Sequence, residues 1–196
     1  MNKKLNIRIN KVYTKKGDSG RTQLIGKNDV SKSNERVECY GQVDELNSSL
    51  GFCKSLIENE NKIDNKKDIL ESINKIQNEL FNLGTMLAVA DESKIKDFPS
   101  LGKKEIAFLE SLIDSYNESL DDLDSFVLPA GSLPGAYFHI CRTVCRRVER
   151  RCVALSSSEK IDDLIIVYLN RLSDLFFVWS RWVNKSSGVP EDLWKP

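Results

Sequence analysis

Apolar residues recur at intervals of three and four along five long stretches of the chain, the spacing that places them on one face of an α-helix. The pattern predicts helices over about 37–60, 69–90, 106–116, 132–155 and 164–183. The most regular stripe is that of the second stretch, Ile69, Ile73, Ile76, Leu80, Leu83, Leu87 and Ala90. Since the links are mostly short, we expect an all-α fold, a five-helix up-and-down bundle.

The segments outside these stretches lack a helical period. Residues 11–34 are rich in Gly, Lys and Ser, which predicts a long ordered loop before the bundle. Residues 126–131, Phe-Val-Leu-Pro-Ala-Gly, form a connector, after which Ser132 can cap the fourth helix. We therefore predict a single domain over 1–196, with a loop region at 1–36, a bundle at 37–188 and a short tail at 189–196.

The overall composition limits the compartment and the class of partner. The 29 Lys and Arg balance the 29 Asp and Glu, so bulk attraction to nucleic acid or an acidic membrane is not expected. No apolar stretch approaches the roughly 18 residues of a membrane span. The five cysteines are an odd number without disulfide-framework spacing, which favours a reducing, cytoplasmic location. Residues 1–17 lack acids, and this leaves a short organellar targeting segment open.

Positive charge is concentrated in the fourth helix, where residues 142–151 hold five arginines and one acid. A helical projection gathers Arg142, Arg146, Glu149 and Arg150 in one sector, with Ile140, Val144, Cys145, Val148 and Leu155 opposite. Like charges one turn apart repel by about 0.2–0.5 kcal/mol per pair, and the arginine fork suits phosphate. An anionic ligand is therefore expected here, although a solvated basic face remains the alternative.

The loop segment Tyr-Thr-Lys-Lys-Gly-Asp-Ser-Gly-Arg-Thr at 13–22 has a composition suited to phosphate. Glycines let backbone N–H groups approach phosphate oxygens, and hydroxyls and cations add donors and charge. A solvated surface turn is the alternative. The segment is not a Walker A motif, since five residues separate Gly20 from Gly26 and Asn28 follows Lys27.

Nucleophilic catalysis by the protein is not expected. Cys141, Cys145 and Cys152 project onto the apolar side of the fourth helix, which favours buried hydrophobes over metal ligands. His139, the only histidine, has no recognisable Ser or Cys nucleophile and carboxylate around it, so a hydrogen-bonded histidine within the bundle is favoured.

Several segments together resemble the PduO-type ATP:cob(I)alamin adenosyltransferases: residues 13–20, 36–38, 40–47 (Tyr-Gly-Gln-Val-Asp-Glu-Leu-Asn), 126–129, His139, 142–150 and 169–174 (Leu-Asn-Arg-Leu-Ser-Asp). The resemblance implies a homotrimer of five-helix bundles that binds ATP and the corrinoid at subunit interfaces. It also implies attack of reduced cobalt on the ribose C5′ of ATP, with release of tripolyphosphate and formation of adenosylcobalamin. ATP, Mg²⁺ and cobalamin are the implied ligands; a cobalamin reductase or an adenosylcobalamin-dependent enzyme is left open as a partner.

The resemblance also assigns residues. Those expected to bind ATP are Thr14, Lys15, Lys16, Gly17, Thr22, Gln23, Lys32, Arg146, Arg147, Glu149, Arg150 and Asn170. Phe126 and Leu128 are expected to contact the corrinoid, with Phe126 on the lower axial side of cobalt, and Glu149 can reach Mg²⁺ carried by ATP. The catalytic set comprises Arg142, Arg146 and Phe126, with Arg142 bracing the subunit interface. Asn34 stands where the family often has Asp, so whether Asn34 or Glu35 pairs with Arg142 is open.

Two other functions use the same residues. A phosphotransferase would employ the same arginines but release ADP. A nucleic-acid-binding bundle would show steep salt dependence and no affinity for ATP.

Overall fold

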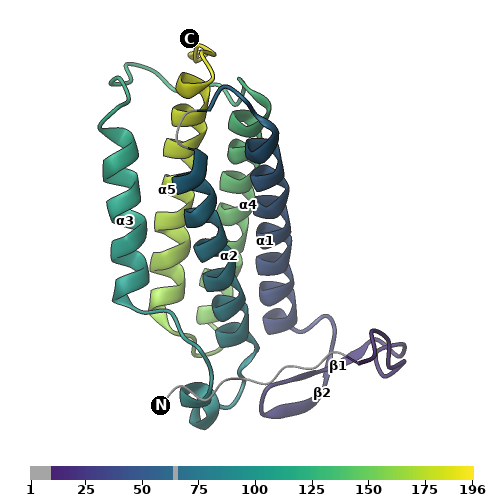
Figure 1. Ribbon diagram of the computed structural model, residues 1–196. Helices are drawn as coiled ribbons and strands as arrows, with labels where there is room; N and C mark the ends of the chain where they lie inside the picture. Colours follow the sequence, from purple (N-terminus) through teal and green to yellow (C-terminus); the bar gives the residue numbers. More distant parts are fainter. Residues whose placement is uncertain (1–9, 64–65) are drawn as a thin grey trace.

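Five α-helices lie side by side in the computed structural model, which describes residues 10–63 and 66–196 (Figure 1). They are α1 (Glu35–Asn59), α2 (Lys66–Ala88), α3 (Lys103–Asn117), α4 (Leu133–Ser156) and α5 (Asp163–Ser186). The five predicted helices are confirmed, each with bounds a few residues from those expected. Residues 1–9, which contain half of the acid-free stretch, lie outside the described residues.

The helices alternate in direction along the bundle, and α4 occupies a central place in it. It packs against both α1 and α5, while α2 packs against α1 and α3 against α5. The apolar stripe of α2 is fully buried from Ile69 to Leu87, as its spacing predicts. Several side chains of α4 remain exposed, among them Ile140, Arg146 and Arg150, and are available for a ligand or another chain.

The start of α4 is fixed to the end of α5. Ser132 caps α4 by accepting a hydrogen bond from the Gly135 N–H at 3.2 Å, which agrees with the predicted cap. Asn184 of α5 accepts hydrogen bonds from the Ser132 N–H and Oγ–H, both at 2.9 Å. A Cβ on Gly135 would lie 2.1 Å from the Asn184 Oδ1 atom, so only glycine permits this approach. The connector that carries Phe126 is thereby held against the bundle.

The all-α expectation was wrong for the N-terminal loop region, which contains a two-stranded antiparallel hairpin. Strand β1 (Arg21–Leu24) pairs with β2 (Lys27–Ser31) at the lower end of the bundle in Figure 1. Gly26, with φ of +88°, occupies the turn. The Ile25 N–H donates to the Ala88 carbonyl at 2.9 Å, and the Ala90 N–H donates to the Ile25 carbonyl at 2.9 Å. The hairpin therefore depends on the end of α2, a contact that no local pattern reveals. A short 3₁₀ helix, η1 (Glu92–Asp97), follows α2.

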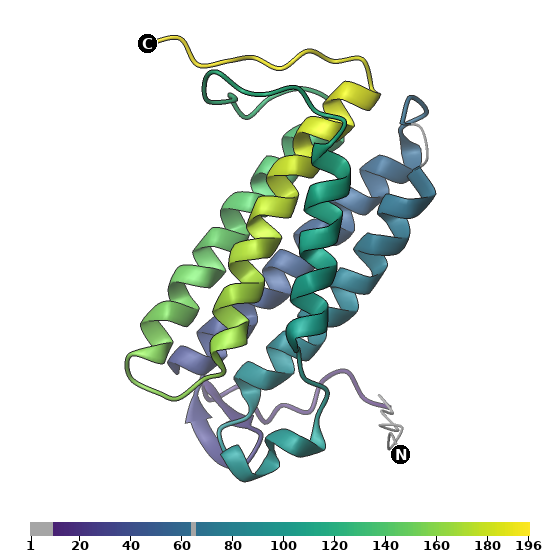
Figure 2. The same cartoon turned by 90° about the vertical axis from the view of Figure 1, so that its left-hand side faces the viewer.

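The C-terminal tail runs beside the connector between α3 and α4 (Figure 2). The Leu128 N–H donates to the Asp192 carbonyl at 2.8 Å, and the Trp194 N–H donates to the Phe126 carbonyl at 2.7 Å. Buried Arg181 pairs with Glu191 at 2.8 Å. The tail is thus part of the structure around Phe126.

Within the described residues, no helix combines the length and apolarity that a membrane crossing requires.

Candidate functional site

Arg146 and Arg150 of α4 are exposed and line a cavity of about 340 Å³ together with Glu149, Val153 and Ala154. Within the described residues, neither arginine makes a hydrogen bond or an ion pair. Two cations one helical turn apart, neither of them paired with a carboxylate among the described residues, form a favourable site for an anion. Three of the four residues of the predicted basic sector, Arg146, Glu149 and Arg150, therefore line one cavity, whereas Arg142 does not.

Asn170 of α5 lies beside these arginines. Its Nδ2–H donates to the Glu149 Oε1 atom at 3.2 Å, and both side chains are half-buried. A carboxylate and a carboxamide thus border the cationic cavity. The fold brings together four of the residues expected to bind ATP: Arg146, Glu149, Arg150 and Asn170.

The other two predicted arginines have different surroundings. Arg147 turns toward α1, where it forms an ion pair with Glu45. Arg142 is half-buried, and no hydrogen bond or ion pair to another described residue holds it. Burial, together with the charge of Arg146, lowers the pKa of Arg142 from its usual value. Only Arg146 and Arg150 therefore face the cavity directly.

The loop residues form a second basic group at the hairpin. The Lys32 N–H donates to the Gly20 carbonyl at 2.9 Å, and a Cβ on Gly17 would lie 3.0 Å from the Lys32 Nζ atom. The side chains of Thr14, Lys15, Lys16 and Gln23 are exposed, while Thr22 is half-buried on β1. The loop projects away from the bundle (Figure 1), and no hydrogen bond or ion pair among the described residues joins it to Arg146 or Arg150. Within one chain the two predicted parts of the ATP site are separate.

Phe126 lies at the opposite end of the bundle, with 78% of its surface exposed. It lines a cavity of about 630 Å³ with the connector residues 123–127, Arg142, Phe177 and Trp194. The centroids of the Phe126 and Trp194 rings are 6.2 Å apart. Leu128 is also exposed. The sequence interpretation missed Phe177 and Trp194 as cavity residues, since their positions depend on the packing of α5 and on the tail.

The cysteine prediction is confirmed and the histidine prediction is wrong. All five cysteines are buried and unpaired, and burial raises the pKa of the Cys145 thiol. His139 is buried, but neither ring nitrogen has a hydrogen-bond partner among the described residues. The neighbouring Arg142 side chain has hydrogen-bond donors but no acceptor. Its positive charge also disfavours protonation of the imidazole. Burial above all, and then Arg142, lower the pKa of His139 to about 4.

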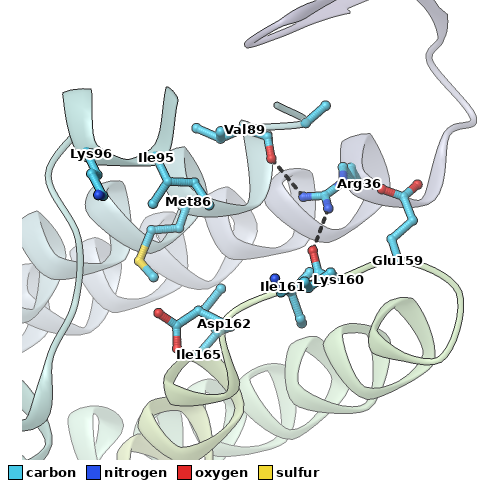
Figure 3. A pocket seen from close by; sticks show the side chains of 11 residues that line it. Arg36, Met86, Val89, Ile95, Lys96, Glu159, Lys160, Ile161, Asp162 and Ile165 are labelled. Carbon is cyan, nitrogen blue, oxygen red and sulfur yellow. Dashed lines mark hydrogen bonds and ion pairs between the residues drawn. The ribbon is translucent and has the colours of Figure 1, made fainter. Parts of the chain in front are cut away.

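A further cavity of about 510 Å³ lies near the hairpin end of the bundle, and Arg36 occupies its wall (Figure 3). The Arg36 guanidinium donates to the carbonyls of Leu87 at 3.1 Å, Val89 at 3.0 Å and Lys160 at 2.9 Å, and it pairs with Glu159. These bonds join α1 to the end of α2 and to the link between α4 and α5. Arg36 lies in one of the segments that carry the resemblance, and these contacts give it a structural role.

Comparison with known proteins identifies the chain as a transferase. The family model for cobalamin adenosyltransferase matches residues 12–183. The chain belongs to the cobalamin adenosyltransferase family. It is 42% identical over 179 residues to the corrinoid adenosyltransferase of Bacillus subtilis, covering 91% of this chain and 89% of that protein.

Two further relatives agree with this assignment. The cobalamin adenosyltransferase of Cupriavidus metallidurans is 38% identical over 188 residues, with 96% of each chain covered. A solved structure of a variant PduO-type ATP:corrinoid adenosyltransferase from Lactobacillus reuteri, complexed with cobalamin and ATP, superposes with a TM-score of 0.87 at 34% identity. That comparison covers 94% of this chain and 97% of the other. The similarity extends over the bundle and the hairpin region alike.

Proposed function

We propose that the protein transfers the 5′-deoxyadenosyl group of ATP to cob(I)alamin, releasing tripolyphosphate and forming adenosylcobalamin. The electron pair of the reduced cobalt forms the bond to C5′, the C5′–O bond breaks, and the triphosphate leaves with that bond's electron pair. Family membership supports this activity. The structural observation that carries it is the pair of unpaired guanidinium groups, Arg146 and Arg150, in a cavity of α4. They would stabilise the negative charge that develops on the leaving group.

The residues around these arginines have complementary roles in the proposal. Asn170 contacts the nucleotide, and Glu149 supplies a carboxylate oxygen to Mg²⁺. No cluster of three or more His, Cys, Asp or Glu able to hold a metal occurs in the part of the chain that the structure describes. We assign Mg²⁺ to the ATP phosphates, whose charge it would help to neutralise. Arg147 joins the phosphates only after leaving Glu45, and an exposed ion pair of this kind contributes no more than about 1 kcal/mol.

The separation of the loop from the arginines supports a homotrimer with active sites between subunits. In this arrangement Thr14, Lys15, Lys16, Gly17, Thr22, Gln23 and Lys32 of one chain complete the arginine cavity of the next. The surface of α4 agrees with such an interface, since Leu133, Ile140 and Val153 are all exposed. Ile140 was expected inside the bundle, and its exposure was not anticipated from the helical projection. Exposed apolar side chains along one helix are typical of a surface that another chain covers.

Substituting Ile140 by glutamate is expected to dissociate the assembly, because a carboxylate at the subunit contact would have to be buried without a partner. Sedimentation analysis should find three times the chain mass of 22.3 kDa for the wild type and a single chain for Ile140→Glu. Ile95→Glu, in η1, is the control and should remain trimeric. A monomeric wild type that still turns over substrate would remove the interfacial site from the proposal.

At the other end of the bundle, we assign the corrinoid to the cavity of Phe126, with Leu128 as a second contact. Arg142 braces the site across the interface, and Glu35 is the better candidate for its partner. Asn34 is already engaged as the cap of α1, accepting from the Arg36 N–H at 3.0 Å. Glu35 is exposed and charged, and accepts one hydrogen bond from the Ser158 hydroxyl at 2.9 Å. A carboxylate provides the charge that Arg142 lacks within its own chain.

The deciding experiment is an anaerobic reaction of the purified protein with Mg-ATP and cob(I)alamin. We expect the absorption spectrum to change to that of adenosylcobalamin, with one tripolyphosphate formed for each adenosyl group transferred. Release of ADP would identify a phosphotransferase, and tight, salt-sensitive binding of nucleic acid without ATP affinity would favour the non-enzymatic alternative.

Five unpaired thiols are consistent with a reducing compartment, so we place the protein in the cytoplasm.

A further inference from the structure

Three buried nitrogen atoms that have no hydrogen-bond partner in the described part of the chain lie within one turn of α4. They are Nδ1 and Nε2 of His139 and Nε of Arg142. The imidazole is 3% exposed. Buried polar atoms in proteins almost always have partners, so a cluster of three orphaned ones indicates that something else supplies the missing hydrogen bonds.

These atoms lie next to the Phe126 cavity. Arg142 and Phe177 both line that cavity, and the centroid of the His139 ring is 6.3 Å from that of Phe177. The charges that act on the imidazole come from Arg142 on its own helix and from Glu191 in the tail. His139 therefore lies beside Phe177 of the cavity wall, and near enough to Arg142 and Glu191 for their charges to act on it.

The nitrogen atoms of His139 and Arg142 offer the hydrogen bonds that a bound carboxamide needs. With its pKa lowered to about 4, the imidazole is neutral near pH 7, so one nitrogen donates and the other accepts. The Arg142 Nε–H adds a donor. A primary carboxamide offers both an accepting oxygen and donating N–H groups, whereas a phosphate offers nothing to the accepting nitrogen. The corrin ring carries several such carboxamides on short side chains around its edge.

We propose that His139 and Arg142 form a subsite for one peripheral carboxamide of the corrinoid, with His139 as a binding residue that positions the ring over Phe126. The inference rests on the proposed corrinoid site at Phe126. The Arg142 side chain makes no hydrogen bond or ion pair with another described residue of its own chain, so its Nε–H is free to donate to the amide beside the imidazole. The amide would then supply hydrogen-bond partners to atoms that have none among the described residues.

The test compares His139→Phe and His139→Asn with the wild type in steady-state adenosylation. His139→Phe keeps a planar ring but removes both nitrogens, so we expect KM for cob(I)alamin to rise roughly 10-fold while KM for ATP and kcat stay unchanged. His139→Asn, which retains a donor and an acceptor, should recover part of the loss. The melting temperature of His139→Phe should not fall, because orphaned polar atoms leave the interior. Trp179→Phe removes another buried, unpartnered N–H from the core and serves as the matched control with no change in either KM.

A second measurement does not depend on stability. It gives the affinities of wild type and His139→Phe for monocarboxylate derivatives of cobalamin, each of which has one carboxamide hydrolysed. For one derivative, the ratio of its Kd to the Kd of cobalamin should differ between wild type and His139→Phe. Equal ratios in the two proteins for every derivative would overturn the subsite. So would an unchanged KM for cob(I)alamin in His139→Phe, or a parallel rise in both KM values with a lower melting temperature. A wild type that does not adenosylate cobalamin would instead refute the proposed function itself.

Discussion

Replacing Arg146 by alanine is expected to lower kcat/KM for adenosyl transfer by roughly 10²–10³-fold, the loss typical when one pre-positioned donor to a developing anion is removed. Arg146 is exposed and makes no ion pair within the described chain, so its side chain contributes little to the fold. The variant should therefore keep the wild-type melting temperature. The effect would arise at the leaving triphosphate, where charge accumulates in the transition state.

Arg151→Ala is the matched control for this experiment. Arg151 is an exposed arginine of the same helix, but its charge acts on Cys39 of α1 and it does not line the cavity. We expect its kinetics to stay within about twofold of the wild type. Continuous spectrophotometric assays with both variants separate a local role of Arg146 from a general effect of positive charge. Equal losses in the two variants would contradict the assignment.

Phe126→Ala is expected to reduce turnover by on the order of 100-fold, a loss comparable to that caused by misplacing a substrate by about 1 Å. The proposal places this ring on the lower axial side of cobalt, where excluding a ligand makes the Co(II) form easier to reduce. Because most of the ring is exposed and its aromatic contact is with Trp194, removing it should not destabilise the bundle. The affinity for ATP should be unchanged, since the cavity of Arg146 and Arg150 is separate from the cavity that Phe126 lines.

Calorimetric titration with ATP and stopped-flow turnover measure the two halves of this prediction separately. Phe81→Ala, at an exposed phenylalanine of α2, is the control and should behave as the wild type. Unchanged turnover in Phe126→Ala, or a loss of ATP affinity equal to the loss of turnover, would argue against an axial role.

Much of the fold could be predicted because helices leave long, local signals. Each stripe of apolar residues spans several turns, and Ser132 marks the start of α4 in sequence as it does in the structure. The hairpin left no such signal, since only Leu24 and Val30 are buried in its strands and its support comes from the end of α2. Local periodicity cannot indicate a contact of that kind.

The candidate site was predictable in composition but not in geometry. The helical projection placed Arg142, Arg146, Glu149 and Arg150 together; the structure agrees for the last three, whereas Arg142 lines the Phe126 cavity. It could not show that Arg147 pairs with Glu45, because that contact joins positions 102 residues apart. Nor could it show that the tail would bring Trp194 to Phe126, or that His139 would be buried without a partner. Each of these depends on tertiary packing between distant segments.

If Arg147 binds a phosphate of ATP as proposed, its ion pair with Glu45 gives α1 a part in nucleotide binding without contact to the nucleotide. If Arg147 serves both Glu45 and a phosphate, the two anions compete for one guanidinium, and the free energies of the two contacts are linked. The pair with Glu45 then weakens the affinity for ATP, and bound ATP weakens the pair by the same factor. The junction of α1 and α4 would then respond to nucleotide occupancy through simple thermodynamic reciprocity.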